Sequence, residues 1–289
     1  MTTLSYTFPA PAKLNLFLHI IGQRPDGYHE LETVFQFLDY GDEITISLNK
    51  SGKINLLTPI EGVAHQDNLV VRAANLLQQV THCTKGADIS IHKVLPMGGG
   101  LGGGSSNAAT VLVALNFLWE LNLPQSTLAE LGLSLGADVP IFIHGYAALA
   151  RGIGEQLTPV FPQEYWYLVT KPNINISTAE IFNDPDLPRH TEKLDSAHFE
   201  IKNCHNDCET LVIKRYPEVA KLLTWLVEYA PSRMTGTGAC VFSRFTSKKE
   251  ALLIQSKLPQ GIESFVAQGI NQSTLQTQLA KIALDVISE

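Results

Sequence analysis

A glycine-rich run at residues 96–107 constrains the fold of this chain more than any other feature. The run reads Pro-Met-Gly-Gly-Gly-Leu-Gly-Gly-Gly-Ser-Ser-Asn, with six glycines in the seven positions 98–104. Glycine loses more backbone freedom on ordering than any other residue, so such a run is not expected inside a helix or strand. Without Cβ atoms, its backbone N–H groups can turn towards a ligand. The run therefore predicts a loop that contacts a ligand through its backbone.

A helix is expected directly after the run, from Ser105 to Leu121. Ser105, Ser106 and Asn107 are residue types that cap helix N-termini, and apolar residues then recur at helical spacing. Free N–H groups and the positive end of the helix dipole attract anions. Because apolar segments flank the run on both sides, we predict a phosphate-binding loop rather than a flexible linker.

Two other glycine motifs fit the run poorly. The P-loop needs a lysine after its last glycine, and Ser105 stands there instead. The dinucleotide-binding motif Gly-x-Gly-x-x-Gly matches Gly98, Gly100 and Gly103. Because almost any run this rich in glycine contains that motif, the match is weak evidence. That motif should also follow the first strand of a βαβ unit, whereas much of the N-terminal half precedes this run. A nicotinamide-dependent oxidoreductase is therefore kept only as an alternative.

Composition narrows the class of protein. The net charge of −7 argues against a general nucleic-acid binder, which would present a basic surface. No apolar run reaches the ~18 residues of a membrane span, and residues 1–12 do not resemble a secretory signal. Cys204 and Cys208 flank His205, but no second close pair completes a zinc site. We therefore expect reduced thiols, no metal bound by the protein alone, and a cytoplasmic location.

The order of expected elements indicates an α+β fold in two layers. The alternation over residues 13–20 predicts a strand with one buried face. The other expected strands lie at 43–48, 53–57, 166–170 and 239–245, and the other expected helices at 68–80, 126–136, 217–229, after the capping box Ser247-x-x-Glu250, and at 275–286. We place a domain boundary within 153–162. The predicted domains are 1–158, which binds ATP and carries the catalytic residues, and 159–289.

Three polar residues are candidates for chemistry. Lys13 and Asn15 are two residues apart and share one strand face, which the pattern alone assigns to solvent. Asp138 follows an expected helix, where an aspartate can also cap or turn the chain. Phosphoryl transfer to an alcohol needs a group that orients the hydroxyl and takes its proton, and a carboxylate suits that task. From these residues alone, structural and catalytic roles both stay open.

The glycine run resembles the ATP loop of the GHMP kinases, the family named for galactokinase, homoserine kinase, mevalonate kinase and phosphomevalonate kinase. The resemblance rests on the pattern Pro-x-x-x-Gly-Leu-Gly-x-x-Ser-Ser at 96–106, followed by alanines. Residues 136–140, Gly-Ala-Asp-Val-Pro, are similar to the segment with the family's catalytic aspartate. Residues 233–240, Arg-Met-Thr-Gly-Thr-Gly-Ala-Cys, resemble its third motif. The resemblance implies a ribosomal S5 domain 2-like N-terminal domain and a ferredoxin-like C-terminal domain.

Four further segments are similar to one branch of this family, whose members phosphorylate 4-diphosphocytidyl-2-C-methyl-D-erythritol in the non-mevalonate isoprenoid route. They read Pro-Ala-Lys-Leu-Asn-Leu at 11–16, Pro-Asp-Gly-Tyr-His-Glu-Leu at 25–31, Pro-Asn-x-x-x-Ser-Thr-x-x-x-Phe at 172–182 and Asn-Asp-x-Glu at 206–209. The branch implies that the chain transfers a phosphoryl group from ATP to the 2-hydroxyl of that compound. Another small-molecule kinase of the GHMP family is the alternative.

The resemblance implies roles for the matching residues around the substrate. Asp138 is expected to act as the base, with Lys13 as its partner, and Asn15 to hold the methylerythritol. Tyr28 and Phe182 are expected to sandwich the cytosine ring, with stacking worth ~1–3 kcal/mol per base. His29 is expected to read the polar edge of that ring, and Thr178 to lie near the reacting hydroxyl.

The resemblance also implies how ATP binds. The implied ATP-binding residues are Pro96, Met97, Gly98, Gly99, Gly100, Leu101, Gly102, Gly103, Gly104, Ser105, Ser106, Asn107, Asn68, Gly236, Thr237 and Gly238. Asn68 is expected near the adenine, and Mg²⁺ is expected to bind through ATP with help from Ser105 or Ser106. We expect a monomer or weak homodimer that binds neither nucleic acid nor membrane. An RNA-binding module, suggested only by the S5-like fold, is the non-enzymatic alternative.

Overall fold

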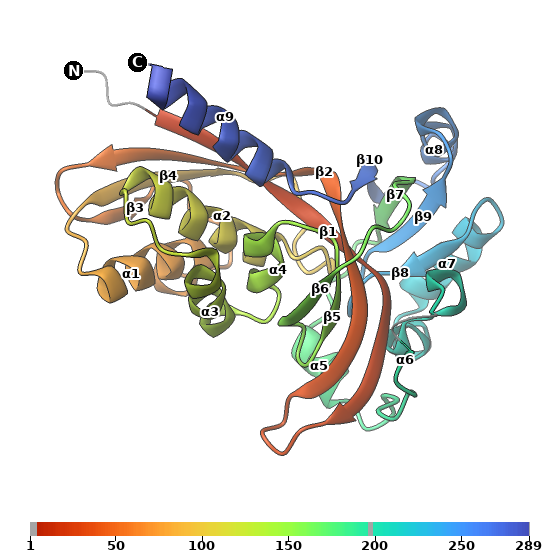
Figure 1. Cartoon of the computed structure of the whole chain (residues 1–289). Coiled ribbons are helices and arrows are strands. Elements are labelled where there is room, and N and C mark those ends of the chain that lie inside the picture. Colours follow the sequence, from red (N-terminus) through yellow and green to blue (C-terminus); the bar gives the residue numbers. More distant parts are fainter. Residues whose placement is uncertain (1–4, 196–198, 289) are drawn as a thin grey trace.

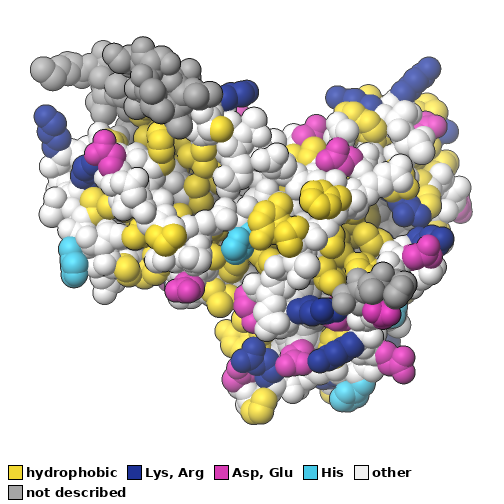
Figure 2. All heavy atoms as spheres, viewed as in Figure 1, with side chains coloured by type: hydrophobic (Ala, Val, Ile, Leu, Met, Phe, Trp, Pro, Cys, Tyr) yellow, Lys and Arg dark blue, Asp and Glu magenta, His cyan; other side chains and the backbone are white. Residues whose placement is uncertain are grey.

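Two long antiparallel strands run through the whole molecule and connect its two lobes (Figure 1). Figure 1 is a computed structural model, which describes residues 5–195 and 199–288. The long strands are β1 (Ser5–Gln23) and β2 (His29–Asn49), and the turn between them forms the lower end of the molecule. Figure 2 shows charged side chains gathered at this lower end, whereas apolar side chains gather between the lobes.

The strands of the described residues form one ten-stranded sheet. Its order is β3-β4-β2-β10-β7-β9-β8, while β1 and β5 also pair with β2, and β6 pairs with β5. The shorter strands are β3 (Ile54–Leu56), β4 (Gly86–His92), β5 (Ala148–Arg151), β6 (Gln156–Pro159), β7 (Trp166–Lys171), β8 (Ser232–Met234), β9 (Val241–Phe245) and β10 (Glu263–Ile270). Because β10 pairs with both β2 and β7, it joins the strands of the two lobes.

The helices cover this sheet in two groups. They are η1 (His65–Asp67), α1 (Leu69–Thr81), α2 (Gly103–Leu118), α3 (Gln125–Leu135), α4 (Val139–His144), α5 (Thr178–Asn183), η2 (Ile201–Asn203), α6 (Asp207–Arg215), α7 (Pro217–Val227), α8 (Lys248–Gln255) and α9 (Thr274–Ser288). The first lobe holds α1 to α4, and α9 lies along β1, while α7 and α8 pack on the strands of the second lobe (Figure 1). The predicted α+β class is confirmed. No helix among the described residues is long and apolar enough to cross a membrane.

β1 is buried on both faces, so the prediction of a single buried face was wrong. Every residue from Ala10 to Ile20 is buried. One face of β1 packs on α2, and the other meets the strands of the second lobe. Its pairing with β2 shifts register between Asn15 and Leu18, a bulge that redirects the side chains that follow. Lys13 and Asn15, assigned to a solvated face by pattern alone, are 3% and 4% exposed.

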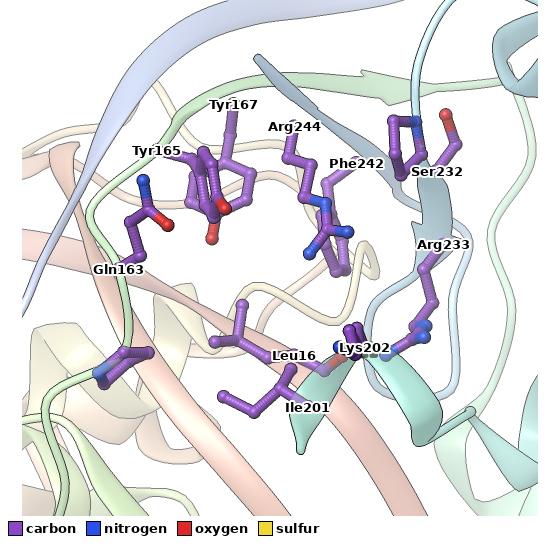
Figure 3. Close-up of a pocket in the computed structure, with 12 residues that line it drawn as sticks. Leu16, Gln163, Tyr165, Tyr167, Ile201, Lys202, Ser232, Arg233, Phe242 and Arg244 are labelled. Atoms are coloured by element: carbon purple, nitrogen blue, oxygen red, sulfur yellow. Dashed lines mark hydrogen bonds between the residues drawn. The ribbon is translucent and has the colours of Figure 1, made fainter. Parts of the chain in front are cut away.

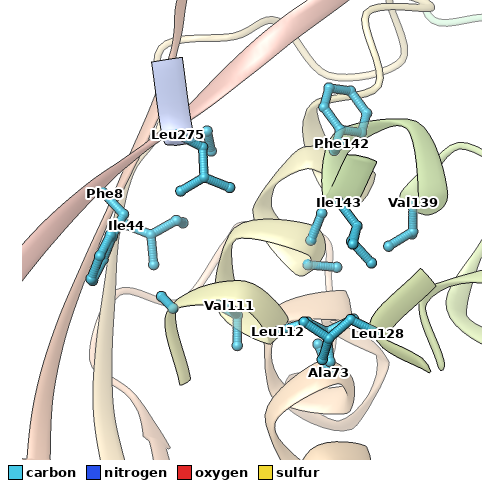
Figure 4. Close-up of a cluster of buried hydrophobic side chains, with 14 of the residues drawn as sticks. Phe8, Ile44, Ala73, Val111, Leu112, Leu128, Val139, Phe142, Ile143 and Leu275 are labelled. Atoms are coloured by element: carbon cyan, nitrogen blue, oxygen red, sulfur yellow. The ribbon is translucent and has the colours of Figure 1, made fainter. Parts of the chain in front are cut away.

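The hydrophobic core of the first lobe includes residues from both ends of the chain (Figure 4). Phe8 of β1, Val111 of α2 and Leu275 of α9 belong to the same cluster. A second cluster fills the other lobe, and a third lies between the lobes under β1. The predicted boundary at 158/159, which falls inside β6, stays a prediction. The terminal helix contributes to the first core, although it is distant from that core in sequence.

Candidate functional site

The helix after the glycine run begins at Gly103, two residues earlier than predicted. Gly102 is its N-cap in the left-handed region, with φ 72°, and makes no side-chain cap. Ser105, Ser106 and Asn107 therefore lie inside the helix, and their assignment as caps was wrong. The reason is that glycine can adopt the left-handed conformation that starts this helix. The first hydrogen bond of the helix runs from the Ser106 N–H to the Gly102 carbonyl at 2.8 Å. The N–H groups that precede Ser106 take no part in the helical hydrogen-bond pattern.

The glycines of the run let it pass close to two neighbouring segments. Gly100 has φ +74°, and a Cβ there would lie 2.3 Å from the Thr235 carbonyl oxygen. Gly102 would place a Cβ 2.8 Å from the ring of Phe142 on α4. Larger residues would push the run away from the loop at 235–238. The glycine run therefore lies directly against the loop at 235–238, which is part of the motif at 233–240. We call this loop the second glycine-bearing loop.

Two cavities meet at this run. The first, of about 380 Å³, is lined by the glycine run, by Asn68 and Lys93, and by apolar residues such as Val63. The second, of about 280 Å³, holds Lys13 and Asn15. Their common wall consists of Gly100, Ser105, Asp138 and Thr178. A ligand in one cavity would therefore adjoin a ligand in the other at the carboxylate of Asp138.

Lys13 and Asp138 form an ion pair at this common wall. The Lys13 Nζ lies 3.2 Å from Asp138 Oδ2, donates to Asn15 Oδ1 at 2.6 Å and to the Gly100 carbonyl at 3.2 Å. The ammonium also lies over the Phe35 ring, 5.1 Å from its centroid. Lys13 is 3% exposed but Asp138 is 37% exposed. The lysine is thus fixed by several partners, whereas the carboxylate stays open to the cavities.

The structure argues against a purely structural role for Asp138. The residue stands at the N-cap of α4, yet its side chain makes no capping hydrogen bond. Its carboxylate points instead at Lys13, which comes from a strand distant in sequence. A capping side chain would accept a hydrogen bond from one of the unpaired N–H groups at the start of α4. The observed direction is the one needed to meet a ligand between the two cavities.

Both the oxygen and the nitrogen of the Asn15 side-chain amide form hydrogen bonds. Its Oδ1 accepts from Lys13, and its Nδ2 donates to Thr33 Oγ1 at 3.0 Å. Its backbone N–H donates to Thr235 Oγ1 at 2.9 Å, which connects β1 to the second glycine-bearing loop. Asn15 lines the second cavity. Its contact with substrate stays a prediction, and its visible task is to orient Lys13.

The three residues expected around the cytosine lie at the turn end of the long hairpin and on α5. His29 is buried and stacks on Phe182, with ring centroids 5.2 Å apart and planes at 26°. Tyr28 is 57% exposed. The ring observed against Phe182 is therefore that of His29, and the expected Tyr28–Phe182 sandwich stays a prediction. Phe182 itself lines the second cavity.

Arg189, which sequence reasoning missed, organises this aromatic group. Its Nε donates to His29 Nε2 at 3.0 Å, and its Nη2 donates to the carbonyls of Phe182 and Asp184. Burial and the nearby Arg189 charge both lower the pKa of His29. Because Nε2 accepts a hydrogen bond, the neutral ring carries its proton on Nδ1. No periodicity or motif marks residue 189, so the sequence offered no signal for it.

The loop at 234–238 is held in place by the segment at 206–209. Asn206 Nδ2 donates to the carbonyls of Met234 and Gly236 at 2.9 and 2.8 Å. Glu209 Oε2 accepts from the Met234 N–H at 2.7 Å, and burial raises the pKa of Glu209. The hydroxyls of Thr178 and Thr237 lie 3.0 Å apart at the second cavity. The Asn-Asp-x-Glu motif thus supports the site without lining it.

The two serines expected near Mg²⁺ differ in position. Ser106 is fully buried, and its hydroxyl donates to the Pro11 carbonyl at 2.7 Å, whereas Ser105 lines both cavities. Asn107 is buried at the wall of the first cavity, and its Oδ1 has no hydrogen-bond partner among the described residues. Asn68 Oδ1 caps α1 by accepting from the Val70 N–H. In the described ranges, no three His, Cys, Asp or Glu side chains could together hold a metal ion.

Comparisons with known families match most of the chain. Residues 68–146 match the family model of the GHMP kinases N terminal domain, and residues 196–263 match that of the GHMP kinases C terminal domain. The chain is 62% identical over 282 residues to the 4-diphosphocytidyl-2-C-methyl-D-erythritol kinase of Colwellia psychrerythraea, covering 96% of this chain and 94% of the relative. It is 55% identical over 275 residues to the enzyme of that name from Pseudoalteromonas atlantica, covering 95% and 96%.

Solved structures with similar folds include members of several kinase groups. A crystal structure of 4-(cytidine 5'-diphospho)-2C-methyl-D-erythritol kinase superposes with a TM-score of 0.80 at 28% identity, covering 91% of this chain and 99% of the other. A homoserine kinase from Cytophaga hutchinsonii superposes with a TM-score of 0.68 at 17% identity, covering 95% and 97%. At that identity the second likeness concerns the fold alone.

Proposed function

The chain belongs to the 4-diphosphocytidyl-2-C-methyl-D-erythritol kinases of the GHMP kinase family, and from this membership we propose that it transfers a phosphoryl group from ATP to the 2-hydroxyl of 4-diphosphocytidyl-2-C-methyl-D-erythritol. The two-domain GHMP kinase fold predicted from the sequence is confirmed. One observation of this chain carries the proposal. The Lys13–Asp138 pair stands where a cavity walled by glycines meets a second cavity.

The pair can act on an alcohol held beside it. Asp138 is open to both cavities, so its carboxylate can accept a hydrogen bond from a hydroxyl and take the proton as the new O–P bond forms. Lys13 is fixed by Asn15 and Gly100, and its charge faces the same point. Phosphoryl transfer depends mainly on positioning and on stabilising the charge of the transferred group. A buried, triply held ammonium requires little reorganisation to do so.

The glycine run fits the phosphates of ATP, and the donor set fits Mg²⁺ bound through them. Backbone N–H groups at the start of α2 favour anions, and Cβ atoms at Gly100 and Gly102 would close the loop. Lys93 lines the same cavity, where its ammonium pairs with the buried Asp42 carboxylate at 2.6 Å and still presents a donor. Mg²⁺ would neutralise phosphate charge, and Ser105 is the serine positioned to contact it, because the Ser106 hydroxyl is occupied.

The aromatic group on the hairpin turn suits the cytidine end of the substrate. His29 and Phe182 present a stacked pair, and the exposed Tyr28 directly precedes His29 in the sequence. The Nδ1–H of a neutral His29 is a donor, and cytosine carries acceptors on its polar edge. The proposal also includes the cytoplasmic location, the monomeric or weakly dimeric state and the lack of nucleic-acid binding expected from the sequence.

Measurement of ADP release tests this function directly. We expect release that needs both Mg²⁺ and 4-diphosphocytidyl-2-C-methyl-D-erythritol. Homoserine, mevalonate and galactose serve as acceptor controls and are expected to give only the background rate. Release driven equally well by one of these alcohols would assign the chain to another kinase of the family. NAD binding without magnesium-dependent ADP release would favour the oxidoreductase.

A further inference from the structure

A third cavity lies apart from the two that meet at Asp138. It measures about 270 Å³ and lies between β1, the segment at 162–165, η2 and one face of β7, β9 and β8 (Figure 3). None of the residues predicted to bind ATP or substrate lines it. Its size is near the lower end of small-molecule sites, which span ~300–1,000 Å³. It therefore has room for one small organic molecule.

Strand pairing gives this cavity one aromatic wall. Tyr167 pairs with Arg244 across β7 and β9, and Phe242 stands two residues before Arg244 on the same face. The rings of Tyr167 and Phe242 meet edge to face at 5.6 Å. Tyr165 contributes a third ring, and Leu16 of β1 contributes an aliphatic surface. A flat apolar body can contact rings on more than one side of this space.

The charged side chains of the lining are all cationic, although the chain as a whole carries a net charge of −7. Lys202 is 63% exposed and pairs with Glu200 at 3.1 Å, and Arg233 donates to the carbonyls of Leu16 and Cys204. Arg244 differs from both, because its guanidinium has neither an ion pair nor a hydrogen bond among the described residues. Its guanidinium lies over the Tyr165 ring, 5.4 Å from the centroid, and points into the cavity in Figure 3. This cation–π contact holds the guanidinium beside the ring and leaves its N–H groups available to a ligand.

We propose that this cavity binds a small aromatic anion, a single planar ring that carries a carboxylate or a phosphate. The ring lies among Tyr165, Tyr167 and Phe242, and the anionic group accepts hydrogen bonds from Arg244. A guanidinium suits this task because it can bind a carboxylate or phosphate through two parallel N–H groups. The site is independent of the kinase chemistry, so its ligand binds while both catalytic cavities are filled.

Calorimetric titration with phenyl phosphate tests the proposal on the whole chain. The protein is first saturated with a non-hydrolysable ATP analogue and CDP, so that the catalytic cavities are filled. We expect saturable binding of phenyl phosphate at a single site under these conditions. Inorganic phosphate, titrated in the same way, is expected to bind at least roughly ten-fold more weakly because it lacks the ring.

Two substitutions and one control locate the bound probe. Arg244→Gln is expected to weaken phenyl phosphate binding by roughly ten-fold or more, since a charge-assisted pair is lost. Gln163→Glu places a negative charge on the exposed wall of the cavity. We expect this charge to weaken phenyl phosphate binding as well. Lys248→Gln removes the matched cation over Trp166, outside the cavity, and is expected to leave binding unchanged. Kinase turnover and thermal melting report that each variant is folded.

The proposal fails under any of four results. These are absence of saturable phenyl phosphate binding, loss of binding once the ATP analogue and CDP are present, equal affinity for inorganic phosphate, and unchanged affinity in folded Arg244→Gln and Gln163→Glu proteins. The second result would move the probe to the catalytic cavities. None of these results bears on ADP release, so the kinase function and this site fail separately.

Discussion

The two cavities that meet at Asp138 are built in different ways. The first, at the glycine run, is shaped mainly by backbone that neighbours in sequence supply, from Pro96 to Ser105. The second is assembled from side chains of β1, β2, α5 and the loop at 236–237, which are far apart in sequence. Backbone N–H groups can bind the phosphates that every family member shares, whereas side chains distinguish one alcohol from another. The contrast predicts that damage to the first cavity affects ATP and damage to the second affects the acceptor.

Asp138 belongs to both cavities and should give the largest effect. We expect Asp138→Asn to lower kcat by about 10²–10⁴-fold, the range for loss of a general base, while ATP still binds. The Asp138 side chain makes no capping hydrogen bond and is 37% exposed, and asparagine has the same shape, so thermal melting should change little. Single-turnover kinetics and nucleotide titration provide the measurement.

Asp67→Asn is a matched control for this change. It removes the same charge from the wall of the first cavity only, at a residue of η1. We expect its kcat to stay close to that of the parent protein. Near-normal turnover in Asp138→Asn would remove the base assignment, and an equal loss in both variants would point to general electrostatics.

Sequence reasoning was better for the first cavity than for the second, and the physical reason is locality. The glycine run, the helix after it and the neighbouring Thr235–Gly238 loop carry their signals in consecutive residues. The Lys13–Asp138 contact joins positions 125 residues apart, and it was expected only through resemblance to a family. Pattern alone assigned Lys13 to solvent, because one strand cannot reveal that both of its faces are covered.

Arg189 lay beyond any local pattern. It meets His29 across 160 positions, in a segment without helical or strand periodicity. The exact start of α2 was also missed, because a left-handed glycine, and not a serine side chain, begins that helix. Both misses concern features that depend on tertiary contacts or on glycine backbone conformation. Neither composition nor spacing encodes them.

Gly100 tests whether the first cavity depends on backbone shape. Gly100→Ala would place a Cβ 2.3 Å from the Thr235 carbonyl oxygen, so we expect the run to shift and KM for ATP to rise by roughly ten-fold or more. Gly261→Ala is the matched control, since Gly261 has φ +84° with no atom within 4 Å of an added Cβ. It should show only backbone strain, about 1–2 kcal/mol in the free energy of unfolding. Equal KM values in both variants would show that close approach of the run is not required.

Arg189 tests whether the second cavity depends on assembled side chains. Arg189→Gln removes the donors that hold His29, Phe182 and Asp184, so we expect KM for the cytidine substrate to rise by roughly ten-fold with little change in kcat or in KM for ATP. Arg215→Gln is the control, because Arg215 pairs with Asp184 at the surface, where such pairs contribute ~0–1 kcal/mol. A parallel rise in KM for ATP would mean that the change spreads beyond the second cavity.

The smallest effect follows from the protonation of His29. Burial and Arg189 lower its pKa below the usual 6.5, so the folded protein keeps the ring neutral where an unfolded chain would already take up a proton. The neutral ring's contribution to stability is therefore complete above pH 6.5 and is lost as the pH falls from 6.5 to the lowered pKa. We expect KM for the cytidine substrate to rise severalfold as the pH falls through the lowered pKa of folded His29, because a protonated His29 can no longer accept from Arg189. Arg189→Gln removes one of the two causes, so the midpoint of that rise should move to higher pH. If the midpoint of the KM rise does not move in Arg189→Gln, Arg189 does not lower the pKa of His29. Groups other than this pair would then determine the specificity of the second cavity.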